Sequence, residues 1–200
     1  MSEGLDAAAR KPDGPDRVAA VAAWVQSLFS IDDAVPTLVG GGAVELYTGG
    51  AYRTGDLDFV GVVTAAAAKR MSEAGFERRG RHWIHERHRL FLEFPDDALD
   101  RGNVVATIRV GTTSVVVVGL EELIVDRLAA WQFWRSEIDG YNAWLLWSSG
   151  NHRPNLARLR ALAERNEASA ALDSLVAFAR THVAREPTHT EVETWARTNP

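Results

Sequence analysis

The chain of 200 residues contains no cysteine, which excludes disulfide bonds, thiolate zinc sites and cysteine nucleophiles together. It also has no uninterrupted apolar run near the roughly 18 residues needed to cross a bilayer, so we expect no membrane contact. The first sixteen residues are polar and lack an apolar stretch suited to export. These absences predict a cytoplasmic protein.

A strong positive charge is absent as well. The chain has 22 Lys and Arg residues against 27 Asp and Glu residues, a formal net charge of −5. Non-specific nucleic-acid binding depends on neutralising phosphates, so an acidic chain is a poor candidate for it. Locally the balance reverses, because residues 69–89 hold seven basic and three acidic residues. This excess is typical either of a solvated hairpin or of a basic rim that attracts a polyanion.

The rest of the composition, 46% hydrophobic and 24% charged, is that of a globular protein. Apolar periodicity predicts an α+β fold with a flexible leader over 1–16, an α+β domain over 17–118 and a helical region over 119–200 packed on it. The expected helices span 17–30, 43–48, 64–74, 120–134, 141–148, 155–165, 168–183 and 188–197, and the expected strands span 36–39, 56–60, 83–85, 89–94, 104–110 and 114–118.

Three common catalytic or nucleotide-binding motifs are missing. After the expected strand over 36–39, Gly40 and Gly42 fit a G-x-G-x-x-G fingerprint, but Glu45 stands in the place of its third glycine. No G-x-x-x-x-G-K-[ST] loop and no G-x-S-x-G elbow occur in the sequence. A dinucleotide fold, a P-loop enzyme and an α/β-hydrolase therefore have no support.

What remains is a glycine turn followed, about a dozen residues later, by Asp56-Leu57-Asp58 on an expected strand. Residues i and i+2 of a strand point to the same face, about 6.6 Å apart. Two parallel carboxylates repel each other unless a cation lies between them, and hard divalent ions prefer such oxygen ligands together with phosphates. The glycines allow backbone N–H groups to approach a phosphate at the start of the next helix.

A third carboxylate completes the set. In Leu90-Phe91-Leu92-Glu93-Phe94, an isolated glutamate lies among large apolar residues on an expected strand. Alternation places Glu93 on the face opposite Leu92 and Phe94. Asp96 and Asp97, which follow directly, are alternative third ligands. The pattern predicts a two-metal site for in-line phosphoryl displacement, with Mg²⁺ or Mn²⁺ as the ion.

This sequence motif resembles that of the DNA polymerase beta-type nucleotidyltransferase superfamily, in particular its small bacterial toxin and abortive-infection branch. The residues that carry the resemblance are Gly41-Gly42-Ala43 and Arg53-Thr54-Gly55-Asp56-Leu57-Asp58. The resemblance covers roughly residues 36–135 and includes the segment over 118–130. It implies a nucleotidyltransferase-like mixed sheet flanked by helices, followed by the C-terminal helical region.

The resemblance also implies site roles. Asp56, Asp58 and Glu93 would be the catalytic, metal-binding carboxylates. The nucleotide-binding residues would be Gly41, Gly42, Arg53 and Thr54. The activity would be the transfer of a nucleoside monophosphate from an NTP to an acceptor hydroxyl on an RNA end such as tRNA, on a protein or on a small molecule, and an antitoxin protein would be a possible partner.

Two positions depart from that family. Relatives commonly have Gly-Ser where this chain has Gly41-Gly42, so a phosphate-contacting hydroxyl is missing, and they often carry lysine where Arg127 stands. These departures leave open a catalytically silent nucleotide-binding or regulatory module of the same fold.

Several other side chains have a functional and a structural interpretation. Arg53 could contact phosphate or pair with Asp56, and Tyr47 and Tyr52 could line the nucleotide pocket or pack in the core, which is the stronger reading. His82, His85 and His88 are too scattered on strands to predict a metal triad. The seven tryptophans are expected mainly in packing between helices, with stacking on an acceptor base as the weaker alternative.

Overall fold

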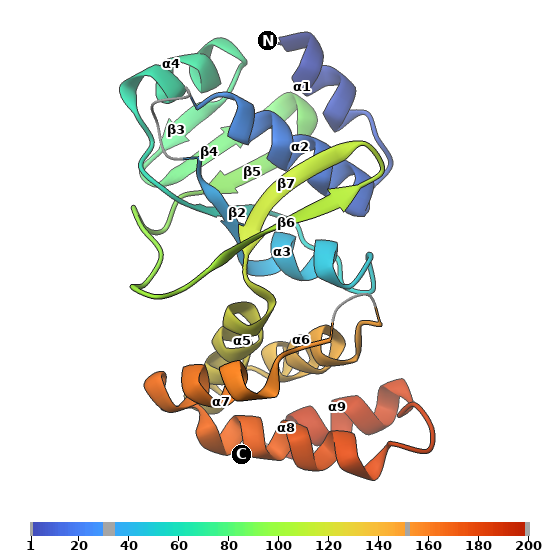
Figure 1. Cartoon of the computed structure of the whole chain (residues 1–200). Coiled ribbons are helices and arrows are strands. Elements are labelled where there is room, and N and C mark those ends of the chain that lie inside the picture. Colours follow the sequence, from blue (N-terminus) through green and yellow to red (C-terminus); the bar gives the residue numbers. More distant parts are fainter. Residues whose placement is uncertain (1, 30–34, 151–152, 199–200) are drawn as a thin grey trace. The chain divides into compact units, whose positions relative to one another are not determined.

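The computed structural model describes residues 2–29, 35–150 and 153–198 (Figure 1). Two compact units divide between Gly119 and Leu120, and each is described by itself below. Ser30, the last residue of the first expected helix, lies outside the described residues. In the described part of the chain, no helix is long and apolar enough to span a membrane.

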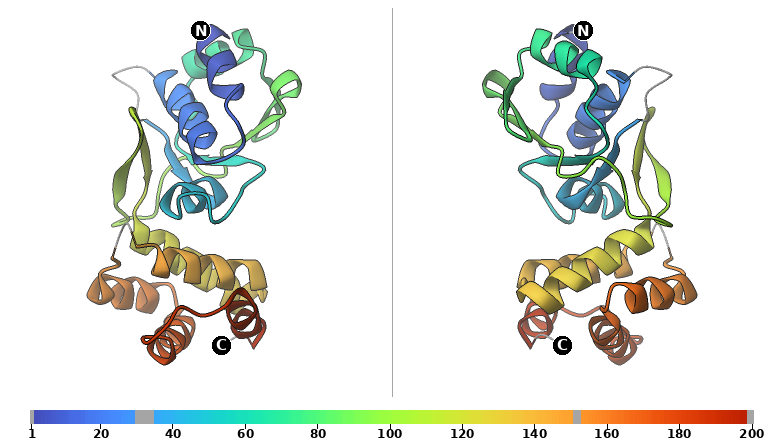
Figure 2. Two further views of the ribbon diagram at one scale, coloured as in Figure 1. Left: turned by 90° about the vertical axis from the view of Figure 1, so that its right-hand side faces the viewer. Right: turned by 90° about the vertical axis from the view of Figure 1, so that its left-hand side faces the viewer.

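A seven-stranded mixed sheet forms the first unit, in the order β3-β4-β5-β2-β1-β7-β6. The pairs β1–β7 and β2–β5 are parallel, and the other neighbours are antiparallel. The β6–β7 hairpin forms one edge (Figure 2). The strands are β1 (Thr37–Val39), β2 (Leu57–Val60), β3 (Glu77–Arg79), β4 (His82–His85), β5 (Leu90–Glu93), β6 (Val105–Val110) and β7 (Thr113–Val118).

Helices flank this sheet, and the predicted α+β class is confirmed. Helix α2 packs against β7, α1 packs on α2, and α3 contacts β1 and β2. The hydroxyl of Thr64 accepts the N–H of Ala67, which begins α4 as expected. The helices of this unit are α1 (Ser2–Ala9), α2 (Pro15–Ser27), α3 (Gly40–Tyr47), α4 (Ala65–Glu73) and the 3₁₀ turn η1 (Glu86–His88).

The structure differs from the expected flexible leader over 1–16. Its described part, residues 2–16, contains α1 and the first two residues of α2, with Pro15 at the start of α2. Leu5 of α1 is 1% exposed, and Asp6 Oδ1 lies 2.5 Å from Nε2 of His88. The polar composition of this stretch therefore gave no indication that Leu5 is buried or that Asp6 contacts His88.

The core of the sheet unit follows strand alternation. Leu38, Phe59 and Leu92 are buried, and the Phe59 ring stacks on Phe94 with centroids 5.6 Å apart. Because alternate residues point to opposite faces, Asp58 and Glu93 lie on the face away from these apolar side chains. Burial of Leu57 and Phe59 thus fixes which way Asp58 points.

In its described residues, 120–150 and 153–198, the second unit contains five helices. Trp131 lies at its centre, fully buried, and its indole N–H donates to the carbonyl of Ala196 over 2.7 Å. Trp131, Trp144 and Trp195 of this unit are buried, as expected for packing between helices, but Trp134 is 82% exposed. The helices are α5 (Leu120–Trp134), α6 (Glu137–Ser148), α7 (Leu156–Arg165), α8 (Ser169–Thr181) and α9 (His189–Thr198).

Candidate metal and nucleotide site

The glycine turn joins β1 directly to α3. Gly40 has φ +58°, and a Cβ at this position would lie 2.2 Å from Oδ2 of Asp58. Both the backbone angle and the close approach therefore require glycine. Val39, which precedes the helix, makes no side-chain cap to α3. The start of this helix thus lies beside the Asp58 carboxylate without a cap from the side chain of Val39.

Gly41 lies against the loop that precedes β2. A Cβ at Gly41 would lie 2.6 Å from Oγ1 of Thr54. The Thr54 hydroxyl in turn donates to the Asp56 carbonyl over 2.9 Å and lies 3.2 Å from Asp56 Oδ1. Three residues singled out by the sequence, Gly41, Thr54 and Asp56, are therefore neighbours in space.

Glu45 of α3 connects the helix to the same loop, a role that the sequence analysis missed. Its Oε2 accepts the backbone N–H of Thr54 over 2.9 Å. The side chain is 1% exposed, and among the described residues its Oε1 has no hydrogen-bond partner. Burial raises the pKa of Glu45 above its usual value. The signal that could have revealed it is an acid inside the apolar run from Ala43 to Tyr47.

Asp58 and Glu93 are partners in register on the adjacent parallel strands β2 and β5. Neighbouring strands lie about 4.8 Å apart, so these two side chains leave the same face side by side. Val39 is the register partner of Asp58 on β1, which places the glycine turn at the same point. The structure thus brings together the second aspartate, the glutamate and the turn.

Asp56 is placed differently. It precedes β2 rather than belonging to it, and it is exposed. Within the residues that the structure describes, no group of three His, Cys, Asp or Glu side chains is arranged to hold a metal ion. Glu93 instead contacts Arg81, with Nε 2.6 Å from Oε1, and Nδ1 of His82 lies 3.6 Å from Oε2.

The residues present nevertheless fit a divalent cation. Asp58 and Glu93 offer hard oxygen donors on one face, and Asp56 stands two residues before Asp58. Gly40 and the Asp58 carboxylate approach each other closely, because a Cβ on Gly40 would lie 2.2 Å from Oδ2 of Asp58. The donor chemistry beside the glycine turn is therefore suited to Mg²⁺ or Mn²⁺ with a phosphate.

Arg53 does not pair with Asp56 in the described structure, and its contact with phosphate stays a prediction. Its guanidinium donates to the backbone carbonyl of Asp13, and it lies against Gly14, where a Cβ would be 2.9 Å from its NH1. It therefore joins the loop before β2 to the segment between α1 and α2. Tyr47 packs as expected, because it is 3% exposed and its hydroxyl donates to the Val118 carbonyl over 2.9 Å.

A cavity of about 840 Å³ opens beside Arg53, Thr54 and Asp56. Lys11 and Arg89 contribute cationic groups to its wall, and Phe91, which is 46% exposed, contributes an aromatic face. The described residues that line it do not include Gly41, Gly42, Asp58 or Glu93. The cavity therefore reaches the candidate site from the side of Asp56.

The histidines and Arg127 have structural partners. His85 is buried with Nε2 3.2 Å from the Ala74 carbonyl, and His88 contacts Asp6. Arg127 belongs to the second unit, where it pairs with Asp126 and, at 2.7 Å, with Asp139. These contacts account for the positions of His85, His88 and Arg127 without a ligand.

Comparison with known proteins gives one informative result. No family model matches the sequence, and no curated protein matches it. Among solved structures, the chain is similar to an antigenic nucleotidyltransferase-like protein from Paracoccidioides brasiliensis, at 16% sequence identity and a TM-score of 0.60, over 94% of this chain and 96% of that one.

The fold that the sequence resemblance implied is therefore confirmed: this chain has a nucleotidyltransferase-like fold, with a mixed sheet flanked by helices and a C-terminal helical unit. A similarity at this identity concerns the fold, and function depends on the site that the fold carries.

Proposed function

We propose that the protein transfers a nucleoside monophosphate from an NTP to an acceptor hydroxyl, with a divalent cation. The observation that carries this proposal is the pairing of Asp58 with Glu93 in register, directly beside the glycine turn at Gly40. Two carboxylates on one face, next to a turn that excludes any side chain, match the needs of a cation bound to a triphosphate.

In this proposal each residue has a defined role. Asp56, Asp58 and Glu93 hold Mg²⁺ or Mn²⁺, which when bound offsets charge on the phosphates and lowers the pKa of the acceptor hydroxyl. The backbone at Gly41 and Gly42 approaches the phosphates, while Thr54 fixes Asp56. The acceptor oxygen bonds to the α-phosphorus, the bond from that phosphorus to the bridging oxygen breaks, and pyrophosphate leaves. A site carboxylate takes the acceptor proton.

The cavity supports a route for the acceptor. It reaches Asp56 without involving the glycine turn, so an acceptor there and a triphosphate at the turn would not compete for the same space. Its wall carries a small cationic excess, which favours an acceptor with negative charge, such as an RNA end, over a neutral small molecule. The charged lining residues are Lys11, Arg17, Arg53 and Arg89 against Asp13, Glu45 and Asp56. A protein acceptor remains a further arm of the test.

The test is transfer of label from each α-labelled NTP to total RNA, to cell protein and to small-molecule extracts, with Mg²⁺. Asp58→Asn should lower transfer about 100-fold or more, because a cation ligand is lost while shape is kept. Asp173→Asn is the matched control, since Asp173 is 67% exposed and pairs with Arg160 in the second unit. Equal transfer by Asp58→Asn and by the unsubstituted protein would contradict the proposal.

One observation favours the silent module as a second candidate. Glu93 is already in contact with Arg81, and Gly42 supplies no hydroxyl. Under this alternative the protein binds an NTP with Mg²⁺ and transfers it to none of the tested acceptors. Nucleotide binding that Asp58→Asn abolishes, without any labelled product, would support the module over the enzyme.

The resemblance of the sequence to a toxin branch supports a test in cells. We propose that induced expression slows growth and that a protein encoded beside this chain relieves the effect. Growth slowed equally by Asp58→Asn would separate toxicity from nucleotidyl transfer, and no slowing at all would contradict the toxin role.

A further inference from the structure

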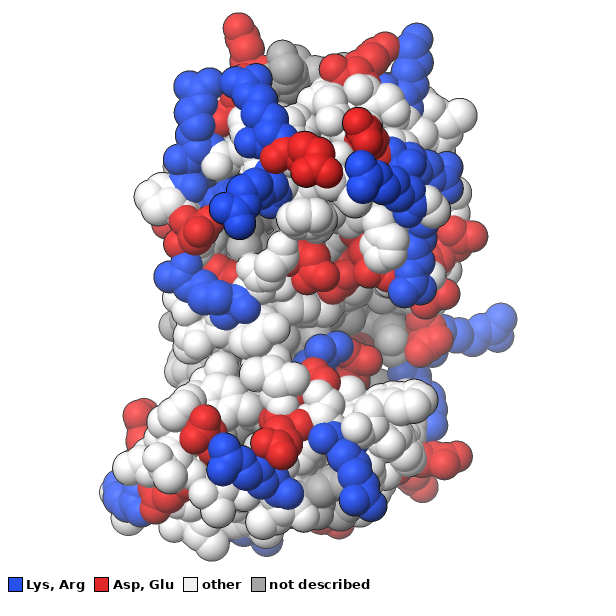
Figure 3. All heavy atoms as spheres, turned by 180° about the vertical axis from the view of Figure 1, so that it is seen from behind, with Lys and Arg blue, Asp and Glu red and all other residues white. Residues whose placement is uncertain are grey.

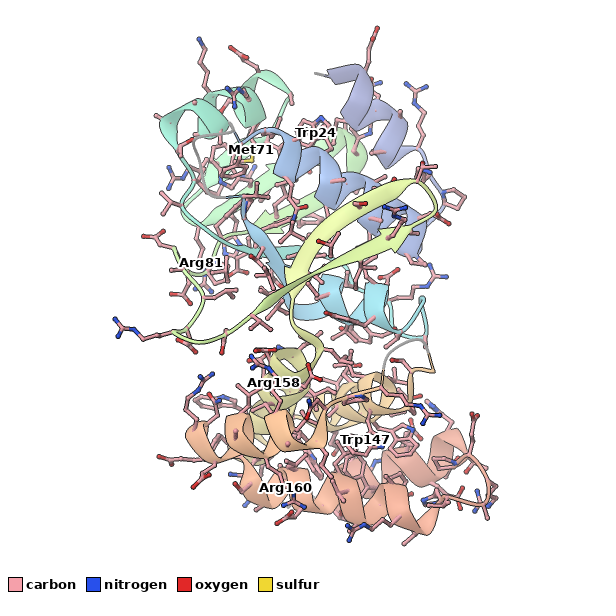
Figure 4. All side chains as sticks on the ribbon, in the orientation of Figure 1. Trp24, Met71, Arg81, Trp147, Arg158 and Arg160 are labelled. Atoms are coloured by element: carbon pink, nitrogen blue, oxygen red, sulfur yellow. The ribbon has the colours of Figure 1, made fainter. Side chains whose placement is uncertain are left out.

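Arg81 occupies the position from which a side chain can reach Glu93. It lies immediately before β4, and its backbone carbonyl accepts the N–H of Phe94 over 3.1 Å (Figure 4). The next residue, His82, is the register partner of Glu93 on β5. The backbone of Arg81 is therefore fixed by β5, while its guanidinium, with the side chain 61% exposed, is free to turn into solvent.

The contact that Arg81 makes competes with any cation at this site. Its Nε lies 2.6 Å from Oε1 of Glu93, and Glu93 is 18% exposed. A carboxylate oxygen that accepts from a guanidinium cannot at the same time give that lone pair to a metal ion. A cation that binds this lone pair of Glu93 together with Asp58 therefore has to displace Arg81 from it.

The pair is also one that a divalent cation can displace. An ion pair with one exposed partner contributes little net stability, because solvent screens it. With no cation between them, the neighbouring carboxylates of Asp58 and Glu93 repel each other, and the guanidinium offsets that repulsion. Arg81 therefore offsets the repulsion between the two carboxylates in the free site, as a bound cation would in the loaded site.

The other arginines of this hairpin are held elsewhere. Arg79 lies 3.2 Å from Glu77 and 3.7 Å from Glu86, and the Arg78 guanidinium lies over the Trp83 ring at 5.6 Å. Figure 3 shows the first unit from behind relative to Figure 1. On this side basic side chains gather in two groups, with acidic side chains between them. Among these three hairpin arginines, Arg81 alone reaches a candidate site carboxylate in the described structure.

We propose that Arg81 is a substrate-binding residue that exchanges partners: it holds Glu93 while the site is free, and it binds a phosphate of the nucleotide when the cation takes Glu93. This inference rests on the proposed function. A phosphate that shares a cation with Glu93 lies within reach of the released guanidinium, and the planar guanidinium suits phosphate oxygens better than a lysine ammonium does.

Mn²⁺ binding without nucleotide tests the first half of the exchange, by electron paramagnetic resonance of free Mn²⁺. Arg81→Ala should bind Mn²⁺ about two- to fivefold more tightly than the unsubstituted protein, which is the effect of removing a screened competitor. Arg79→Ala is the matched control, with the same loss of charge on the same hairpin. Equal affinities of the two variants would overturn the proposal, because a general charge effect would then suffice.

Binding of a non-hydrolysable NTP analogue with Mn²⁺ tests the second half. Arg81→Ala should bind the analogue about tenfold more weakly, since a charge-assisted hydrogen bond to phosphate is lost. Arg81→Lys should recover part of this affinity, and Arg79→Ala should bind as the unsubstituted protein does. Analogue affinity that is unchanged in Arg81→Ala would overturn the exchange.

The two proposals fail in different ways. If neither the unsubstituted protein nor Arg81→Ala binds Mn²⁺, the cation-dependent function fails and the exchange fails with it. If both bind Mn²⁺ and the analogue equally well, only the exchange fails. If Arg81→Ala binds Mn²⁺ and the unsubstituted protein does not, the competition is supported in its strongest form.

Discussion

The two units of the molecule use their buried polar groups in different ways. In the helical unit the buried indole N–H of Trp131 meets a backbone carbonyl, and Arg127 lies between two aspartates. In the sheet unit Glu45 keeps a buried oxygen without a partner among the described residues, and Asp58 and Glu93 stand side by side on one face. In the helical unit Arg127 thus faces opposite charges, although Asn142 Oδ1 is buried there without a hydrogen-bond partner among the described residues, whereas the sheet unit places two carboxylates side by side.

This difference indicates where function is concentrated. Paired carboxylates and a buried acid lower stability unless a ligand compensates, so proteins keep them at sites of binding or catalysis. Substitutions in the helical unit should therefore change stability and leave ligand binding intact, whereas substitutions around the glycine turn should weaken ligand binding as well. The following predictions test this separation.

The largest expected effect is on the helical unit. Trp131→Ala removes a fully buried ring that lies 4.5 Å from the Trp195 ring, and should lower the free energy of unfolding of this unit by about 3–5 kcal/mol. Thermal unfolding by circular dichroism measures it. NTP-analogue binding at a temperature where both units are folded should be unchanged. A loss of that binding would show that the site extends beyond the sheet unit.

Gly40→Ala should act on the site first. It places a Cβ 2.2 Å from Asp58 Oδ2 in a backbone conformation that disfavours side chains, and should destabilise the sheet unit by about 1–3 kcal/mol. It should also weaken Mn²⁺ and analogue binding, measured by calorimetry. Gly111→Ala is the matched control, because Gly111 has φ +57° and no heavy atom near an added Cβ. Equal binding losses in both variants would place the cause in backbone strain instead.

A smaller effect is expected at the start of α9. Thr188 Oγ1 accepts the N–H of Glu191 over 3.3 Å, and Glu191 Oε2 accepts the N–H of Thr188 over 2.8 Å, so the two residues form a capping box. Thr188→Ala should cost about 1 kcal/mol in urea unfolding of the helical unit. Thr194→Ala, within the same helix, should have a smaller effect, and the opposite order would contradict the capping role.

The smallest effect concerns the buried Glu45. Burial raises its pKa in the folded protein, so its contribution to stability is greatest below the unfolded value of about 4.5 and is lost as pH rises through the folded value. Glu45→Gln does not ionise. The melting temperature of the variant relative to the unsubstituted protein should therefore rise by about 2–4 °C from pH 4 to pH 8. A difference that stays constant with pH would contradict an ionisable, buried Glu45.

Much of the fold could be predicted because its signals are local. The run before Gly40, the alternation at Leu57 to Val60 and the periodicity from Leu120 to Trp134 each depend on neighbouring residues. The strand β3 was missed because Glu77, Arg78 and Arg79 are all exposed and show no apolar alternation. Helix α1 was missed because Leu5 is its one large apolar side chain.

The candidate site combines local features with features that depend on distant segments. The glycine turn and the aspartate pair are short-range patterns, but Asp56 leaves the strand because the loop held by Thr54 ends only at Leu57. The partners of Glu45 and Glu93 could not be predicted. Both depend on which segments meet in space, and nothing in the sequence near Arg81 indicates that it faces Glu93.

The parallel pairing of β2 with β5 has a consequence for biosynthesis. Asp58 and Glu93 become neighbours only after α4, β3 and β4, which separate their strands in the chain, have been made and placed. Such non-local pairings form late, because closing a long loop costs entropy before any contact is gained. A nascent chain that ends before Glu93 therefore cannot assemble the carboxylate pair, and any toxicity of the protein would begin only once this pairing is complete.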